Sequence, residues 1–106
     1  MRLDISGNTT IDGPTPVRVE QVLRGMLAAG ESYVSLDAGE QDYVMALPSE
    51  FQGDFYDLEF REGSADRHYE AGDSRPVDEV VEVFLSYLRG DNVWRTRVEW
   101  KRVDQS

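Results

Sequence analysis

Residues 75–100 read RPVDEVVEVFLSYLRGDNVWRTRVEW, and the two halves of this stretch follow different periodicities. In the first half, apolar residues recur three and four positions apart, as they do on the buried side of an amphipathic helix. A proline suits the first helical position, and a glycine suits the C-terminal cap. The pattern predicts a helix over 76–89, capped by Ser74 or Arg75. Its buried stripe comprises Val77, Val80, Val81, Phe84, Leu85 and Leu88.

The second half alternates between two sets of side chains over 93–101, which is typical of a β-strand. The set expected to pack under the helices is Trp94, Thr96, Val98 and Trp100. The opposite set is Arg95, Arg97, Glu99 and Lys101. We expect these bases to pair across strands with the carboxylates of Asp57 and Glu59.

Another helix is predicted over 16–29, where the sequence carries start and stop signals. Thr15 suits the N-cap, Pro16 suits the first turn, and Gly30 suits the C-terminal cap. The apolar stripe of this helix is Val19, Val22, Leu23, Met26 and Leu27.

The remaining segments alternate between turn signals and are predicted to be strands. Residues 32–38 and 42–48 flank the turn GEQ and form a hairpin, and further strands follow over 54–62 and 67–71. Residues 1–6 add a strand at the edge of the sheet. The fold class is therefore α+β, a mostly antiparallel β-sheet with two helices packed on one face, in the order β-α-β-β-β-β-α-β. The inward side chains of 54–62 are Tyr56, Leu58 and Phe60.

Composition restricts the class of protein. With 106 residues the chain suits a single α+β domain spanning 1–106. The net charge of −10 is concentrated over 31–82, where fifteen acids outnumber three arginines. A field of this sign repels nucleic acid and anionic membrane surfaces and attracts basic proteins. Because cysteine and long apolar runs are missing, we expect a cytoplasmic protein with no membrane or nucleic-acid partner.

The sequence carries no catalytic signature. His68 is the only histidine, and without a second histidine or a cysteine it makes a poor metal site or triad. We expect it to face solvent from a strand or turn. Asp57 and Glu59 share a strand face, which suits acid–base chemistry but is more typical of a solvated or salt-bridged surface. We therefore predict no metal, no cofactor and no enzymatic activity.

The stretch VDEVVEVFLSYLRGDNVWRTRVEW, over 77–100, resembles the C-terminal signature of the first-described immunity protein family of bacterial polymorphic toxin systems. That signature is a helix of the type evv.aF..Yl.gd..W followed by a strand with a second tryptophan. The segments over 32–47 and 56–63 resemble the family's central hairpin and acidic strand, with Glu59 at the acidic position. The matching C-terminal residues are Val80, Val81, Phe84, Tyr87, Leu88, Gly90, Asp91, Trp94 and Trp100.

The resemblance implies a non-enzymatic protein that binds and neutralises a cognate bacterial toxin domain, often a nuclease or deaminase. The charge map fits this function, because basic clefts that bind nucleic acid attract acidic inhibitors. An aromatic side chain within an acidic rim would serve as an anchor. The predicted partner-binding residues are Asp37, Glu40, Asp42, Glu50, Phe51, Asp54, Phe55, Asp57 and Glu59.

Two alternative functions remain compatible with the sequence. One is an acidic regulatory or assembly module for another basic protein. The other is a small ligand-binding domain, with a pocket between sheet and helices. That pocket would be lined by Tyr33, Tyr43, Tyr56 and Trp100. None of these interpretations specifies an oligomeric state.

Overall fold

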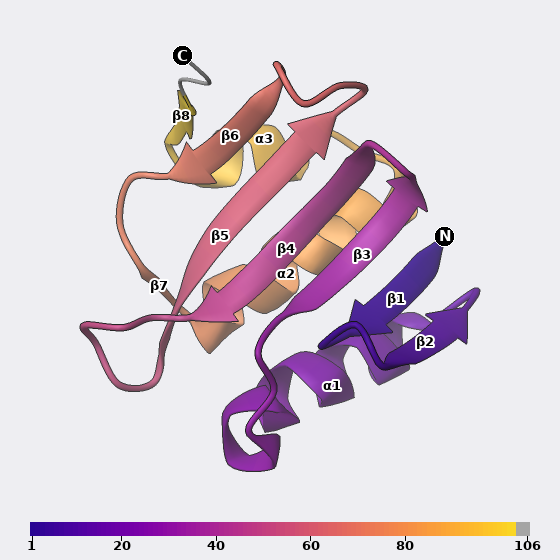
Figure 1. Cartoon of the computed structure of the whole chain (residues 1–106), viewed down its shortest axis with the longest axis vertical. Helices are drawn as coiled ribbons and strands as arrows, with labels where there is room; N and C mark the ends of the chain where they lie inside the picture. Colours follow the sequence, from indigo (N-terminus) through magenta and orange to yellow (C-terminus); the bar gives the residue numbers. More distant parts are fainter. Residues whose placement is uncertain (104–106) are drawn as a thin grey trace.

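The computed structural model describes residues 1–103, which form an antiparallel sheet of eight strands with three helices on one of its faces (Figure 1). The predicted α+β class is confirmed. The strand order is β2-β1-β3-β4-β5-β6-β8, and the short β7 pairs with β5. The strands are β1 (Arg2–Ile5), β2 (Thr9–Asp12), β3 (Val34–Gly39), β4 (Asp42–Pro48), β5 (Phe55–Glu62), β6 (His68–Ala71), β7 (Arg75–Pro76) and β8 (Trp100–Arg102). The helices are α1 (Pro16–Ala29), α2 (Val77–Arg89) and α3 (Val93–Arg97).

The N-terminal part differs from the prediction, because two strands precede α1 and the first is not at the edge. β1 lies between β2 and β3, and β2 is the edge strand. The turn between them uses left-handed backbone at Ser6 (φ 55°) and Gly7 (φ 75°). The N–H of Gly7 also donates to Oδ1 of Asp4 at 3.1 Å. This turn returns the chain along β1 and creates the second strand.

Helix α1 begins and ends where its sequence signals predict. Oγ1 of Thr15 accepts a hydrogen bond from the N–H of Arg18 at 3.2 Å, and Gly30 adopts φ 70° at the C-terminal cap. Val19, Leu23 and Met26 are fully buried, as expected for the apolar stripe. At the margins of this stripe, Val22 is only partly buried and Leu27 is exposed.

Helix α2 supplies most of the helical side of the core, but the predicted caps at Ser74 and Arg75 are wrong. The helix begins at Val77 with Pro76 as N-cap and no side-chain cap. Oγ of Ser74 instead donates to Oδ1 of Asp57 at 2.6 Å, which joins the segment before the helix to the sheet. Val80, Val81 and Phe84 are buried as predicted. Val83 and Ser86 are buried in addition, because α2 also packs against α1 and α3.

The predicted strand over 93–101 is wrong in its first half, which forms α3. The free N–H groups at the start of this helix find acceptors on the preceding segment. The N–H of Val93 donates to Oδ1 of Asp91 at 3.1 Å, and the N–H of Trp94 donates to Oγ of Ser86 at 3.0 Å. Nε1 of Trp100 donates to the carbonyl of Trp94 at 3.3 Å. These tertiary acceptors and donors stabilise a single helical turn that periodicity alone does not reveal.

The predicted burial of the tryptophan side of this segment is largely confirmed. Trp94 is 4% exposed and Val98 is 6% exposed, whereas Trp100 is partly buried and Thr96 is exposed. Phe60 of β5 lies at the centre of their aromatic cluster, with ring centroids 4.8 Å from Trp94 and 4.7 Å from Trp100. Burial of such rings contributes strongly to a small core.

The predicted pairing of the C-terminal arginines with Asp57 and Glu59 is wrong. Arg95 donates to both carboxylate oxygens of Glu62, at 3.0 and 3.1 Å, and Arg97 pairs with Glu82. The reason is that α3 carries both arginines onto the helical side of the molecule.

Candidate protein-binding face

The sheet face opposite the helices is uncovered along the part of the chain that the structure describes, and we call it the open face (Figure 1). Strand pairing and alternating burial determine which side chains it carries. Tyr43, Met45 and Leu47 of β4 form an apolar strip along its middle. The polar side chains around this strip and on the neighbouring strands of the same face are Arg2, Asp4, Ser35, Asp37, Asp57, Glu59, Arg61, His68, Glu70 and Lys101.

His68 does not face solvent as predicted, because neighbouring side chains on the open face leave it only 7% exposed. Nε of Arg61 donates to Nδ1 of His68 at 3.2 Å, so this nitrogen is an acceptor. The proton is therefore on Nε2, which donates to Oε1 of Glu59 at 2.7 Å. Both ring nitrogens are thus occupied by neighbours and neither points to a free substrate position.

Arg61 extends this network towards the β3–β4 turn. Its Nη1 donates to Oε1 of Gln41 at 2.9 Å, and its guanidinium lies 5.6 Å from the ring centroid of Tyr43. Arg61 therefore covers part of the apolar strip and holds a positive charge among the surrounding acids.

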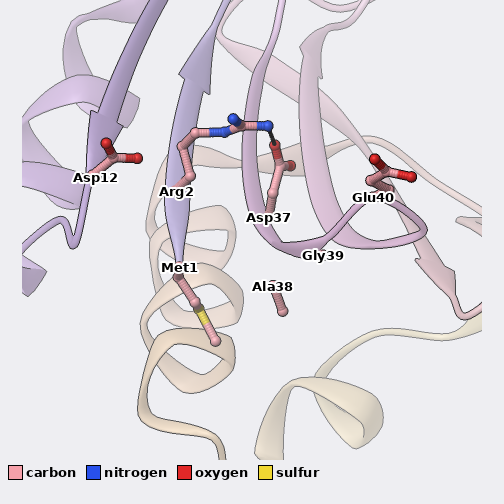
Figure 2. Close-up of a pocket in the computed structure, with 7 residues that line it drawn as sticks. All are labelled: Met1, Arg2, Asp12, Asp37, Ala38, Gly39 and Glu40. Carbon is pink, nitrogen blue, oxygen red and sulfur yellow. Dashed lines mark ion pairs between the residues drawn. The ribbon is translucent and has the colours of Figure 1, made fainter.

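One hollow of the surface lies where β1 and β2 approach the β3–β4 turn (Figure 2). We call it the Arg2 hollow, because Arg2 reaches across it towards Asp37, with 3.9 Å between Nη2 and Oδ2. Burial, followed by the charge of Asp4, raises the pKa of Asp37, while the hydrogen bond from Ser35 and the charge of Arg2 oppose this rise. The Arg2 hollow has a volume of about 440 Å³, and Asp12 and Glu40 also line it.

A second hollow lies between the β4–β5 loop and the segment from β6 to β7, and we call it the carboxylate hollow. Its volume is about 420 Å³. Oγ of Ser74 donates to Oδ1 of Asp57 at 2.6 Å and accepts from Oγ of Ser49 at 3.1 Å, so it joins the two flanking segments. The side chains that characterise this hollow are Leu47, Glu50, Phe51, Asp57, Glu59 and Glu70.

The nine predicted partner-binding residues fall into three places. Glu50, Phe51, Asp57 and Glu59 come together in the carboxylate hollow. Asp37 and Glu40 line the Arg2 hollow. The other three, Asp42, Asp54 and Phe55, line neither hollow.

Three of the nine predicted residues lie in clearly different surroundings. Asp42 begins β4 on the helical side, where its charge contributes to the raised pKa of Tyr87. Phe55 begins β5 opposite Pro76 and is partly buried. Phe51, in contrast, is 92% exposed at the tip of the β4–β5 loop.

The prediction missed Glu70, although the alternation of β6 contains the necessary signal. Tyr69 stacks on Phe60 with centroids 4.6 Å apart, so it points to the helical side. Glu70, its neighbour in the strand, must then point to the open face, next to Glu59.

The alternative pocket lined by four aromatic residues is not formed. Tyr56 is buried on the helical side, and Trp100 packs there against Phe60. Tyr43 is on the open face, as is Tyr33, whose hydroxyl donates to Asp4 at 3.2 Å. The sheet therefore separates the residues that the pocket would need.

Among residues 1–103, no group of three or more His, Cys, Asp or Glu side chains is arranged to hold a metal ion. Nor does any helix there have the length and apolar character needed to cross a membrane. Comparison with known protein families, with curated proteins and with solved structures finds no match to this chain.

Proposed function

We propose that this protein is a non-enzymatic immunity protein, which binds a basic bacterial toxin domain through its acidic open face and neutralises it. The observation that carries the proposal is the concentration of carboxylates around an apolar strip on a sheet face that no described helix covers. A surface with an apolar centre and charged rim is typical of protein interfaces. The sign of the charge favours a basic partner.

The toxin class is supported by the resemblance of residues 77–100 to the immunity family. Phe84, Trp94 and Trp100, three of the residues that carry it, belong to the core or pack against it. The resemblance therefore concerns the scaffold, while the acidic face would determine the partner. A nuclease or deaminase domain, with a basic cleft for nucleic acid, has the charge that such a face would bind.

The test has a binding part and a neutralisation part. The tagged protein is used to capture partners from its host's lysate at low salt, and the bound proteins are identified by mass spectrometry. We expect a toxin domain from the C-terminus of a large secreted protein, released as the salt concentration rises. Expression of that domain alone should stop bacterial growth, and coexpression with this protein should restore it. A captured protein whose toxicity is unaffected by coexpression would contradict the proposal.

A further inference from the structure

His68 and Arg61 lie directly opposite each other in the β5–β6 pair, and both side chains point to the open face. Nε of Arg61 donates to Nδ1 of His68 at 3.2 Å, while Nε2 of His68 donates to Oε1 of Glu59 at 2.7 Å. The ring therefore lies between a cation and a carboxylate, and each of them occupies one ring nitrogen. Because the histidine is only 7% exposed, solvent has little access to replace either partner.

A second proton on this ring must go to Nδ1, because Nε2 already carries one. Nδ1 would then be a donor, and it would face the N–H of Arg61, which is a donor as well. The hydrogen bond between the two side chains cannot survive this change. The imidazolium would also place a second positive charge directly opposite the guanidinium, and like charges in this position destabilise an antiparallel pair. A doubly protonated His68 is therefore incompatible with the present position of Arg61.

The carboxylates on this face favour the protonated ring once Arg61 has moved. The carboxylate of Glu59 is already placed to form a charge-assisted hydrogen bond with an imidazolium. Glu70 follows on the same side of β6, but Lys101 of β8 lies directly opposite it and offsets its charge. Glu59 is therefore the main stabilising group. Among residues 1–103, the charged or titratable groups that face His68 are Glu59 and Arg61 of β5, Tyr43 of β4, Glu70 of β6 and Lys101 of β8.

Arg61 has a contact that would support it away from the ring. Its Nη1 donates to Oε1 of Gln41, in the exposed β3–β4 turn, at 2.9 Å. Its guanidinium also lies 5.6 Å from the ring centroid of Tyr43. Within residues 1–103 no carboxylate forms an ion pair with Arg61, so neutral partners hold it on the open face. Loss of the His68 contact would let the guanidinium turn outward with Gln41.

We infer that His68 is a proton switch of the open face. The singly protonated ring accepts from Arg61 and holds the guanidinium beside Tyr43. A second proton, taken from solvent onto Nδ1, displaces Arg61, while the imidazolium stays bound to Glu59. One consequence rests on the proposed function: acid adds a positive charge to the open face and frees a guanidinium there, so a basic partner binds less tightly.

The first measurement is an NMR titration of the free protein from about pH 8 to about pH 5, the range in which an imidazole ordinarily gains its second proton. The nitrogen shifts of His68, the sole histidine, report how many protons the ring carries and where. The Nε–H signal of Arg61 reports the hydrogen bond. At the alkaline end only Nε2 should be protonated, and the signals of both residues should then change together with one midpoint. Arg18, exposed on α1, is the internal reference, and its signal should not follow that midpoint.

Two variants distinguish a coupled change from a general effect of acid. In His68→Asn the side-chain oxygen can take the place of Nδ1 and accept from Arg61, but it gains no proton in this range. The Arg61 signal should then stay at one position throughout the titration. In Glu59→Gln the coupled change should move to lower pH, because the carboxylate that stabilises the imidazolium is gone.

Two results of this titration would overturn the inference. In one, His68 gains its second proton while the signal of Arg61 stays where it was. In the other, the ring remains singly protonated over the whole range.

The captured toxin tests the consequence for the partner. Its affinity is measured for the unmodified protein and for His68→Asn at both ends of the same pH range. Between the two ends, the affinity of the unmodified protein should fall about threefold or more relative to that of His68→Asn. The ratio cancels the titration of groups on the toxin itself. An equal pH dependence of the two proteins would overturn the effect on the partner.

The two measurements also separate this inference from the proposed function. Coupled signals of His68 and Arg61 in a protein that neutralises no toxin would overturn the function and leave the switch intact. Neutralisation of a toxin by a protein in which the two signals change independently would overturn the switch and leave the function intact.

Discussion

Oγ of Ser86 accepts a hydrogen bond from the backbone N–H of Trp94 at 3.0 Å, across eight positions of sequence. The same hydroxyl donates to Oδ1 of Asp91. Ser86 is 1% exposed, so its position in the middle of α2 is explained by this double role rather than by solvation. It joins the end of the long helix to the start of α3.

Replacement of Ser86 by alanine should lower the free energy of unfolding by about 1–3 kcal/mol, because the buried N–H of Trp94 loses its acceptor. Denaturation by urea at neutral pH would measure this loss. Ser32→Ala, at an exposed position between α1 and β3, is the matched control and should change stability by less than about 0.5 kcal/mol. A Ser86→Ala protein as stable as the control would contradict the capping role.

Arg95 and Glu62 should make stability depend on pH in the acid range. The two hydrogen bonds from Arg95 lower the pKa of Glu62 below its ordinary value of 4.5. Because the pKa is lower in the folded state, this stabilisation is present above pH 4.5 and is lost as pH falls through the folded pKa.

Arg95→Lys should remove the bidentate contact at the cost of about 0.3–1 kcal/mol at neutral pH, a small amount because both side chains are partly solvated. The difference between the two proteins should shrink as pH falls below 4.5. Urea titrations at pH 7 and pH 3 would show it, and a difference that stays constant would contradict the assignment.

Tyr87 should limit stability in alkaline solution. Burial raises the pKa of this tyrosine from 10.0 to about 12, with the charges of Asp42 and Asp37 as further causes. Its ring lies 5.4 Å from that of Trp94. Since the folded pKa is raised, this stabilisation is complete below pH 10 and is lost as pH rises towards 12.

Tyr87→Phe should therefore flatten the fall in unfolding free energy over that pH range. The absorbance of tyrosinate would follow ionisation directly, and Tyr87 should be among the last of the five tyrosines to ionise. Ionisation of every tyrosine near pH 10 in the folded protein would contradict this prediction.

Thr15→Ala should destabilise α1, because the N–H of Arg18 loses its side-chain acceptor. N-cap replacements of this kind cost about 0.5–2 kcal/mol. Thr15→Ser keeps the hydroxyl and provides the control in the same thermal unfolding experiment. Equal losses for both variants would indicate that the methyl group, not the hydrogen bond, matters.

The features that could be predicted from the sequence are those with local causes. The caps of α1 and the alternation of β5 require only neighbours a few positions away, and both are found as predicted. Helix α3 was missed because its acceptor at Ser86 belongs to another helix. The interior position of β1 depends on pairing with β3, 29 to 35 residues further along the chain, which no local pattern specifies.

The candidate site also has some residues that local patterns predict and others whose position depends on distant parts of the chain. Asp57 and Glu59 were placed on one strand face by alternation alone. Their approach to Phe51 and Glu70 required the register of β5 with β6 and the path of the β4–β5 loop. The charge pattern predicted the acidic segment, but only some residues of that segment line the carboxylate hollow.

The connectivity of the sheet also implies an order of assembly. Strands β3 to β6 pair with their neighbours in sequence, so these contacts close short loops and can form early. The β1–β3 pair encloses α1, and the β6–β8 pair encloses α2 and α3. Closing these longer loops costs more chain entropy than closing the short hairpins, so we expect the two flanks of the sheet to dock after the central meander. Because the carboxylate hollow is built from that meander, the β4–β5 loop and the few residues that follow β6, we expect it to form before the flanks of the sheet dock.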